Sequence, residues 1–83
     1  MHAKEVGIIN SVYDKKIGHN LKVLREKRKM TQEELSAKLQ VMGCDITRSA
    51  LAKIEVAQRH IYPDEILAFK KIFNVSFEEI FKE

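Results

Sequence analysis

The segments Thr31-Gln-Glu-Glu-Leu-Ser-Ala-Lys-Leu39 and Thr47-Arg-Ser-Ala-Leu-Ala-Lys-Ile-Glu55 carry the strongest pattern in this 83-residue chain. Each begins with a threonine, a residue that often caps a helix by accepting a backbone hydrogen bond. In the first segment Glu34 stands three residues after the threonine, which is the spacing of a capping box. In the second segment Leu51 and Ile54 have the spacing of residues on one face of a helix. The sequence therefore predicts two short helices separated by a turn.

The second of these helices is expected to leave a polar surface free, formed by Arg48, Ser49 and Lys53 around the small Ala52. Two short helices joined by a turn, with polar side chains on the second, form the helix-turn-helix arrangement. In that arrangement the second helix enters the major groove of DNA. A DNA-binding module is therefore the leading interpretation.

Apolar residues recur at helical spacing along the rest of the chain from residue 17 onward. The expected buried stripes are Ile17, Leu21 and Leu24; Leu35, Leu39 and Met42; Ala50, Leu51 and Ile54; and Ile66, Phe69 and Phe73. Hydrophobic staples are expected for the pairs Met30–Leu35 and Val75–Ile80.

Turn and cap residues place the helix boundaries. Gly43 permits a left-handed exit from a helix that reaches about residue 42, and Pro63 suits the first turn of a fourth helix. Ser76 with Glu79 repeats the capping box and starts a short fifth helix. We therefore predict an all-α domain of five helices over residues 17–83.

Residues 1–16 fit this pattern less well. Val6, Ile8, Ile9 and Tyr13 are apolar, but Gly7 and the β-branched neighbours allow either a short extra helix or an extended N-terminal arm. The sequence leaves both possibilities open, so residues 1–16 are treated as a segment separate from the domain at 17–83.

Composition agrees with one small domain whose partner is anionic. The net charge is +3, and Lys22, Arg25, Lys27, Arg28 and Lys29 fall within eight residues. This cluster suits phosphate attraction, although a solvated helix face would look the same. The chain shows no signal peptide and no membrane-spanning run, and its single cysteine cannot form an internal disulfide. A reducing cytoplasm and no membrane partner are expected.

Catalysis is not expected. The three histidines, Cys44 and the carboxylates show no zinc-site spacing, and the chain has no glycine-rich phosphate loop and no nucleophile elbow. We therefore expect a protein that is not an enzyme, with no metal, no cofactor and no catalytic residue.

Four segments together resemble the phage-repressor/Cro type (XRE-like) of helix-turn-helix proteins. They are Ile17–Glu26, Thr31–Leu35, Ser49–Glu55 and Asn74–Phe81, and the resemblance spans about residues 17–82. It implies a five-helix, lambda-repressor-like domain whose third helix reads double-stranded DNA. It also implies a homodimeric transcriptional regulator, with a repressor favoured, of prokaryotic or phage origin.

The resemblance also implies roles for particular residues, carried over position by position. These are base contacts by Thr47, Arg48, Ser49 and Lys53; phosphate contacts by Gln32, Arg59 and His60; and an ion pair between Arg25 and Glu55 that ties the first helix to the third. Two surfaces are candidates for the dimer contact, and the C-terminal helix with Phe77, Ile80 and Phe81 is favoured because it matches the family's usual interface. The N-terminal segment is the other, as a reinforcement or a swap between subunits.

Two features depart from the family pattern. The turn from Gln40 to Asp45 is longer than usual, and Val56-Ala57 stands where a glycine normally follows the third helix. If position 57 needs a positive φ, alanine is strained there or the loop takes another path.

An alternative function is a protein-interaction module that kept this fold, such as an antitoxin or a coactivator-like bridging domain. The polar third helix disfavours it, because protein-binding helices more often expose apolar anchors. With no sensor domain in the sequence, regulation by a small-molecule ligand is not expected.

Overall fold

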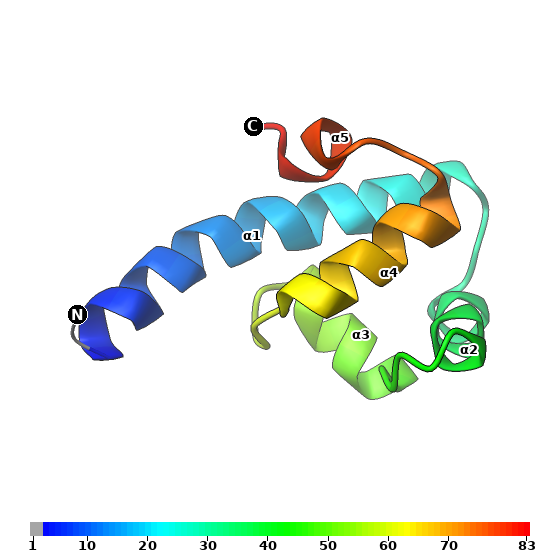
Figure 1. Ribbon diagram of the computed structural model, residues 1–83, viewed down its shortest axis with the longest axis horizontal. Helices are drawn as coiled ribbons and strands as arrows, with labels where there is room; N and C mark the ends of the chain where they lie inside the picture. Colours follow the sequence, from blue (N-terminus) through cyan, green and yellow to red (C-terminus); the bar gives the residue numbers. More distant parts are fainter. Residues whose placement is uncertain (1–2) are drawn as a thin grey trace.

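The computed structural model describes the backbone of residues 3–83 and the side chains from residue 12 onward. It contains five helices (Figure 1): α1 (Ala3–Lys27), α2 (Gln32–Val41), α3 (Arg48–Glu55), α4 (Pro63–Phe73) and α5 (Phe77–Phe81). The described residues contain no strand, so the predicted all-α class is confirmed. None of these helices is long and apolar enough to cross a membrane.

The first helix is longer than the stripe of Ile17, Leu21 and Leu24 predicts. The backbone is helical from Ala3, so residues 3–16 form the first half of α1 and continue directly into the domain. The helix ends at Lys27, and Lys29 adopts a left-handed conformation with φ 56° that turns the chain toward α2. The side chains of Val6, Ile8 and Ile9, which we considered for the dimer interface, lie outside the described part of the chain.

Local hydrogen bonds explain where the next helices begin. The Thr31 hydroxyl accepts from the Glu34 N–H at 3.0 Å, and the Thr31 N–H donates to the Glu34 carboxylate at 2.9 Å, which completes the predicted capping box. The Ser76 hydroxyl accepts from the Glu79 N–H at 3.3 Å. Only that half of the second predicted box forms, because the Glu79 carboxylate contacts Lys82 instead.

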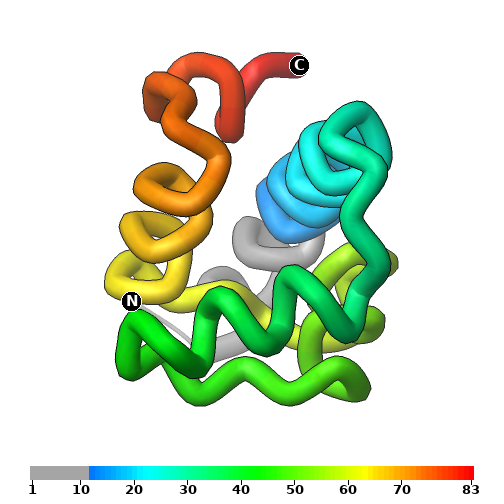
Figure 2. Tube along the Cα trace, turned by 90° about the vertical axis from the view of Figure 1, so that its right-hand side faces the viewer, coloured from blue at the N-terminus to red at the C-terminus, as the bar shows by residue number. Residues whose placement is uncertain are grey.

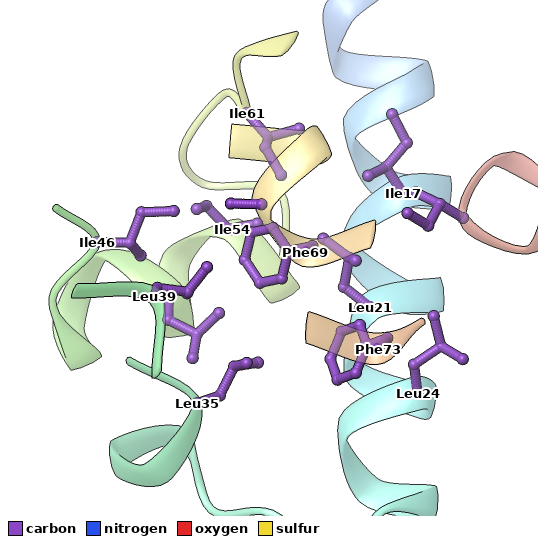
Figure 3. Close-up of a cluster of buried hydrophobic side chains, with 13 residues drawn as sticks. Ile17, Leu21, Leu24, Leu35, Leu39, Ile46, Ile54, Ile61, Phe69 and Phe73 are labelled. Atoms are coloured by element: carbon purple, nitrogen blue, oxygen red, sulfur yellow. The ribbon is translucent and has the colours of Figure 1, made fainter. Parts of the chain in front are cut away.

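One apolar core joins the helices (Figure 3). Its fully buried members include Leu21, Leu35, Leu39, Ile46, Leu51, Ile54, Phe69, Phe73 and Ile80. Burying each of these side chains contributes about 1.5–3 kcal/mol. Met42 does not belong to the core as predicted: it is 44% exposed, because it lies at the C-cap of α2 and lines open grooves at the surface.

The C-terminal helix is held on α1 by one buried amide. The Asn20 side chain donates to the carbonyl oxygens of Ile80 and Lys82, each at 2.7 Å. Both carbonyls lie at the end of α5, where helical carbonyls lack intrahelical partners. The two hydrogen bonds hold α5 on α1, and both views show α5 on the opposite side of the molecule from α2 and α3 (Figure 1 and Figure 2).

Candidate nucleic-acid interface

The third helix separates its polar and apolar residues onto opposite faces. Leu51, Ile54 and Glu55 are buried, whereas Ala52 is half-buried. The four residues predicted to contact bases, Thr47, Arg48, Ser49 and Lys53, are all exposed. All four lie at the start and middle of α3, on the solvent-exposed part of the helix.

Two of these side chains have partners within the protein. The Thr47 hydroxyl accepts from the Ala50 N–H at 3.1 Å and caps α3, which leaves its own proton free to be donated. The Arg48 Nε lies 3.8 Å from the Glu33 carboxylate on α2. Both are solvated, with the side chains 64% and 78% exposed, so this pair adds little stability.

A buried ion pair fixes the end of α3 against α1. The Glu55 carboxylate accepts from Arg25 Nε at 2.7 Å and from Arg25 Nη2 at 3.1 Å, so the expected pair is present. Arg25 also donates to the Met30 carbonyl at 2.8 Å. The hydrogen bonds that Arg25 donates to Glu55 raise the pKa of its guanidinium, against the smaller opposing effect of burial.

Gln32 joins this network from the first turn of α2. Its side-chain amide donates to the Glu55 carboxylate at 3.0 Å. The three helices α1, α2 and α3 therefore meet at one carboxylate, which sets the angle between α2 and α3. The phosphate contact predicted for Gln32 has to be made without this N–H, by its other side-chain atoms or by its backbone.

The close approach of α1 and α3 depends on Gly18. A Cβ atom at this position would lie 2.2 Å from the Ile54 carbonyl oxygen and 3.2 Å from the Glu55 carbonyl carbon and oxygen. Both neighbours are backbone groups, which cannot rotate away as a side chain can. In the sequence this glycine is one residue of the segment Ile17–Glu26 that carries the resemblance, and no local pattern indicates its role.

A polar contact and a buried isoleucine shape the long turn before α3. The Ser36 hydroxyl donates to the Ile46 carbonyl at 2.7 Å, and the Ile46 side chain is fully buried. The Gln40 amide donates to the Ser36 oxygen at 3.1 Å. Gly43 has φ 82°, as the predicted left-handed exit from α2 requires. The longer turn is thus an ordered part of the domain.

The loop after α3 contains the other predicted phosphate contacts. Ala57 has φ 62°, so the chain keeps the left-handed conformation at the position where the family pattern has glycine. Arg59 forms a bidentate ion pair with Glu65: Nη1 donates to Oε1 at 3.0 Å and Nη2 donates to Oε2 at 2.9 Å. A phosphate contact by Arg59 would have to compete with this pair.

His60 also has a partner that the sequence did not predict. Its Nδ1 lies 3.2 Å from both carboxylate oxygens of Asp14, which is buried on α1. The His60 ring packs edge-on against Tyr62, with ring centroids 4.8 Å apart. These contacts tie the loop after α3 to the first half of α1. No sequence signal reveals them, because Asp14 and His60 are separated by 46 positions.

The basic cluster at the end of α1 is only partly available for phosphates. Arg25 is buried in its ion pair, and Arg28 donates to the Phe73 carbonyl at 2.6 Å while lying over the Phe73 ring. Lys22 and Lys27 are exposed. Two of the five residues, Arg25 and Arg28, therefore serve the fold through contacts within the protein.

Cys44 is half-buried beside α4 and is not set up as a nucleophile. Burial raises the pKa of its thiol, and the carboxylates of Glu65 and Asp64 raise it further. A thiol with a raised pKa is protonated at neutral pH and reacts slowly. Among the described residues, no group of three or more His, Cys, Asp or Glu side chains is placed to hold a metal ion.

Comparison with known proteins connects this surface to a family. A family model described as helix-turn-helix matches residues 21–80. This match runs from α1 to α5 and includes both α2 and α3. No curated protein and no solved structure matches the chain.

Proposed function

Because the chain belongs to the XRE type of helix-turn-helix DNA-binding transcription regulators, we propose that it reads a specific site in the DNA major groove with α3 and represses transcription there. The observation that carries this proposal is the exposed polar face of α3 on a helix whose other face is fixed. Arg48 and Lys53 donate to guanine O6 and N7, and the hydroxyls of Thr47 and Ser49 serve several bases or a phosphate.

We place the DNA backbone at the first turn of α2 and at the loop after α3. Unpaired backbone N–H groups and the helix dipole favour an anion at such a helix start. Gln32 lies there, and Arg59 and His60 lie in the loop. Contacts of this kind set the register of the protein on DNA but do not identify bases.

Substitution of the two cationic residues on α3 tests the proposal. After selection of a preferred site from random duplexes, Arg48→Ala and Lys53→Ala should each weaken binding to that site by about 1–3 kcal/mol and change binding to random DNA little. Lys82→Ala, which removes the same charge near α5 on the other side of the molecule, is the control. Equal losses on preferred and random duplexes would show that Arg48 and Lys53 contact phosphates and do not read bases.

Salt dependence tests the backbone contacts. If Arg59 binds a phosphate, Arg59→Ala should weaken binding to every duplex and reduce the slope of log affinity against log salt by roughly one unit. A slope equal to that of the unmodified protein would leave Arg59 with its ion pair to Glu65 as its only role.

We further propose that the protein binds as a symmetric homodimer. One short reading helix contacts only a few base pairs, and two related helices square the discrimination. The stacked rings of Phe77 and Phe81 on α5 support a contact there, since they are 46% and 44% exposed. Footprinting should show two half-sites about one helical turn apart. A single half-site bound by a monomer at saturating DNA would defeat this model.

Repression itself needs a separate measurement. A reporter promoter that carries the selected site should lose expression as the protein is induced, and the Arg48→Ala variant should restore it. Increased expression with the unmodified protein would make the regulator an activator.

A groove between α2 and α4 favours a second candidate, the protein-interaction module. It has a volume of about 470 Å³ and is lined by Met30, Ala37, Lys38, Val41, Met42 and Ile72. Apolar side chains are therefore exposed on α2, although not on α3. Binding to random duplex DNA separates the candidates, because a DNA-binding protein shows a steep dependence on salt and an interaction module does not.

A further inference from the structure

The exposed pair between Glu33 and Arg48 joins the first turn of α2 to the start of the reading helix. The Glu33 carboxylate lies 3.8 Å from the Arg48 Nε, longer than a hydrogen bond but within reach of a direct charge contact. Arg48 belongs to the face proposed to read bases, so this contact brings an anion to a surface that has to approach DNA. A role in stability is not its explanation, since both side chains are well solvated.

We propose that Glu33 positions Arg48 and makes it select a base over a phosphate. This inference rests on the proposed function, because it assigns a second residue to the same DNA-reading site. Two physical effects of one carboxylate carry it: the direction in which it holds the guanidinium, and the repulsion that it exerts on the DNA backbone.

The direction follows from which nitrogen is contacted. The arginine side chain has five N–H donors in one plane, and Glu33 lies beside the one on Nε. Both terminal amino groups of Arg48 therefore stay free, and together they match the O6 and N7 acceptors of guanine. A guanidinium whose Nε edge is attracted to a carboxylate turns less often toward a neighbouring phosphate.

The repulsion follows from where Glu33 stands. Its neighbour Gln32 is the first residue of α2, at the end we place against the DNA backbone. A carboxylate about 7 Å from a phosphate in water weakens binding to any duplex by about threefold. Glu33 therefore lowers the affinity for every duplex, preferred or random, whereas the guanine contact that it favours in Arg48 raises affinity at the preferred site alone.

Glu33→Gln tests the proposal, with Glu78→Gln as a matched control. Each substitution removes one carboxylate from the second residue of a helix, but Glu78 lies on α5, on the other side of the molecule. We expect Glu33→Gln to raise affinity for random duplex about threefold. We expect the ratio of its preferred-site affinity to its random-duplex affinity to decrease by about threefold to tenfold. This decrease is part of the discrimination that one bidentate contact from arginine to guanine supplies. On a duplex with a single half-site, where the proposed contact between α5 helices is not needed, Glu78→Gln should change neither quantity.

The Arg48→Ala background shows whether the effect passes through arginine. There, Glu33→Gln should raise both affinities equally and leave their ratio unchanged. A ratio that falls in this background by as much as in the unmodified protein would overturn the positioning role. An unchanged ratio for Glu33→Gln in the otherwise unmodified protein would overturn the proposal as a whole.

Nuclear magnetic resonance of the free protein separates this inference from the proposed function. The Arg48 Nε–H resonance should shift on Glu33→Gln and stay in place on Glu78→Gln. If it does not shift, the pair is absent in solution and the inference fails, whatever DNA binding shows. If it shifts while Arg48→Ala leaves selectivity unchanged, Arg48 does not read bases, and both the proposed function and this inference fail.

Discussion

Replacing Glu55 with glutamine is the sharpest test of how α3, the proposed reading helix, is held. The Glu55 side chain is 1% exposed and that of Arg25 is 10% exposed, so the pair lies almost wholly out of water. The carboxylate accepts two hydrogen bonds from Arg25 and a third from Gln32. Glutamine supplies one acceptor oxygen, but its amide group points N–H donors at the other donors and leaves the buried guanidinium without a counter-charge.

The expected loss follows from that burial. Removing one partner of a buried ion pair costs about 3–5 kcal/mol, because the remaining charge stays desolvated. Since glutamine keeps one acceptor, we expect about 3 kcal/mol for Glu55→Gln. In a domain of this size such a loss lowers the melting temperature by roughly 12–24 °C.

Thermal and urea unfolding followed by circular dichroism at neutral pH measure this loss. Glu78→Gln, at an exposed position, should stay within about 0.5 kcal/mol of the unmodified protein. A double variant with Arg25→Met and Glu55→Leu should recover much of the loss, because apolar residues of similar volume can replace a buried pair. A melting temperature for Glu55→Gln within a few degrees of the unmodified protein would refute the buried network.

Three other substitutions test the surroundings of the site. Gly18→Ala should destabilise the domain by about 2–3 kcal/mol and weaken DNA binding in gel-shift assays, since the new Cβ would lie 2.2 Å from the Ile54 carbonyl and push α3 away. Ala57→Gly should raise stability in urea by up to about 1 kcal/mol, because relief of the φ of 62° outweighs the entropy that glycine adds to the unfolded chain. Burial raises the pKa of Glu65, but the stronger combined effect of Arg59 and a backbone N–H holds it below the ordinary value of 4.5. Its ionised form therefore stabilises the fold above that pH, by about 2 kcal/mol, and the difference between the unmodified protein and Glu65→Gln should shrink as the pH of the melts falls below 4.5.

The sequence alone predicted the local structure around the reading helix correctly. Thr31 with Glu34 and Thr47 with Ala50 are hydrogen-bonded pairs three residues apart. Their geometry is set by the helix itself, so spacing is enough to identify them. The prediction for Met42 was wrong because this residue is the C-cap that follows α2, where spacing no longer tells which side chains are buried.

The contacts that orient the reading helix were decided by tertiary packing. Gly18 is needed because the backbone of α3 lies against α1, and His60 meets Asp14 across 46 positions of the chain. Arg28 was predicted as part of a cationic surface and instead donates to the carbonyl of Phe73, 45 positions away. Such pairs follow from the angle at which the helices pack around a shared core, and no spacing within the sequence encodes that angle.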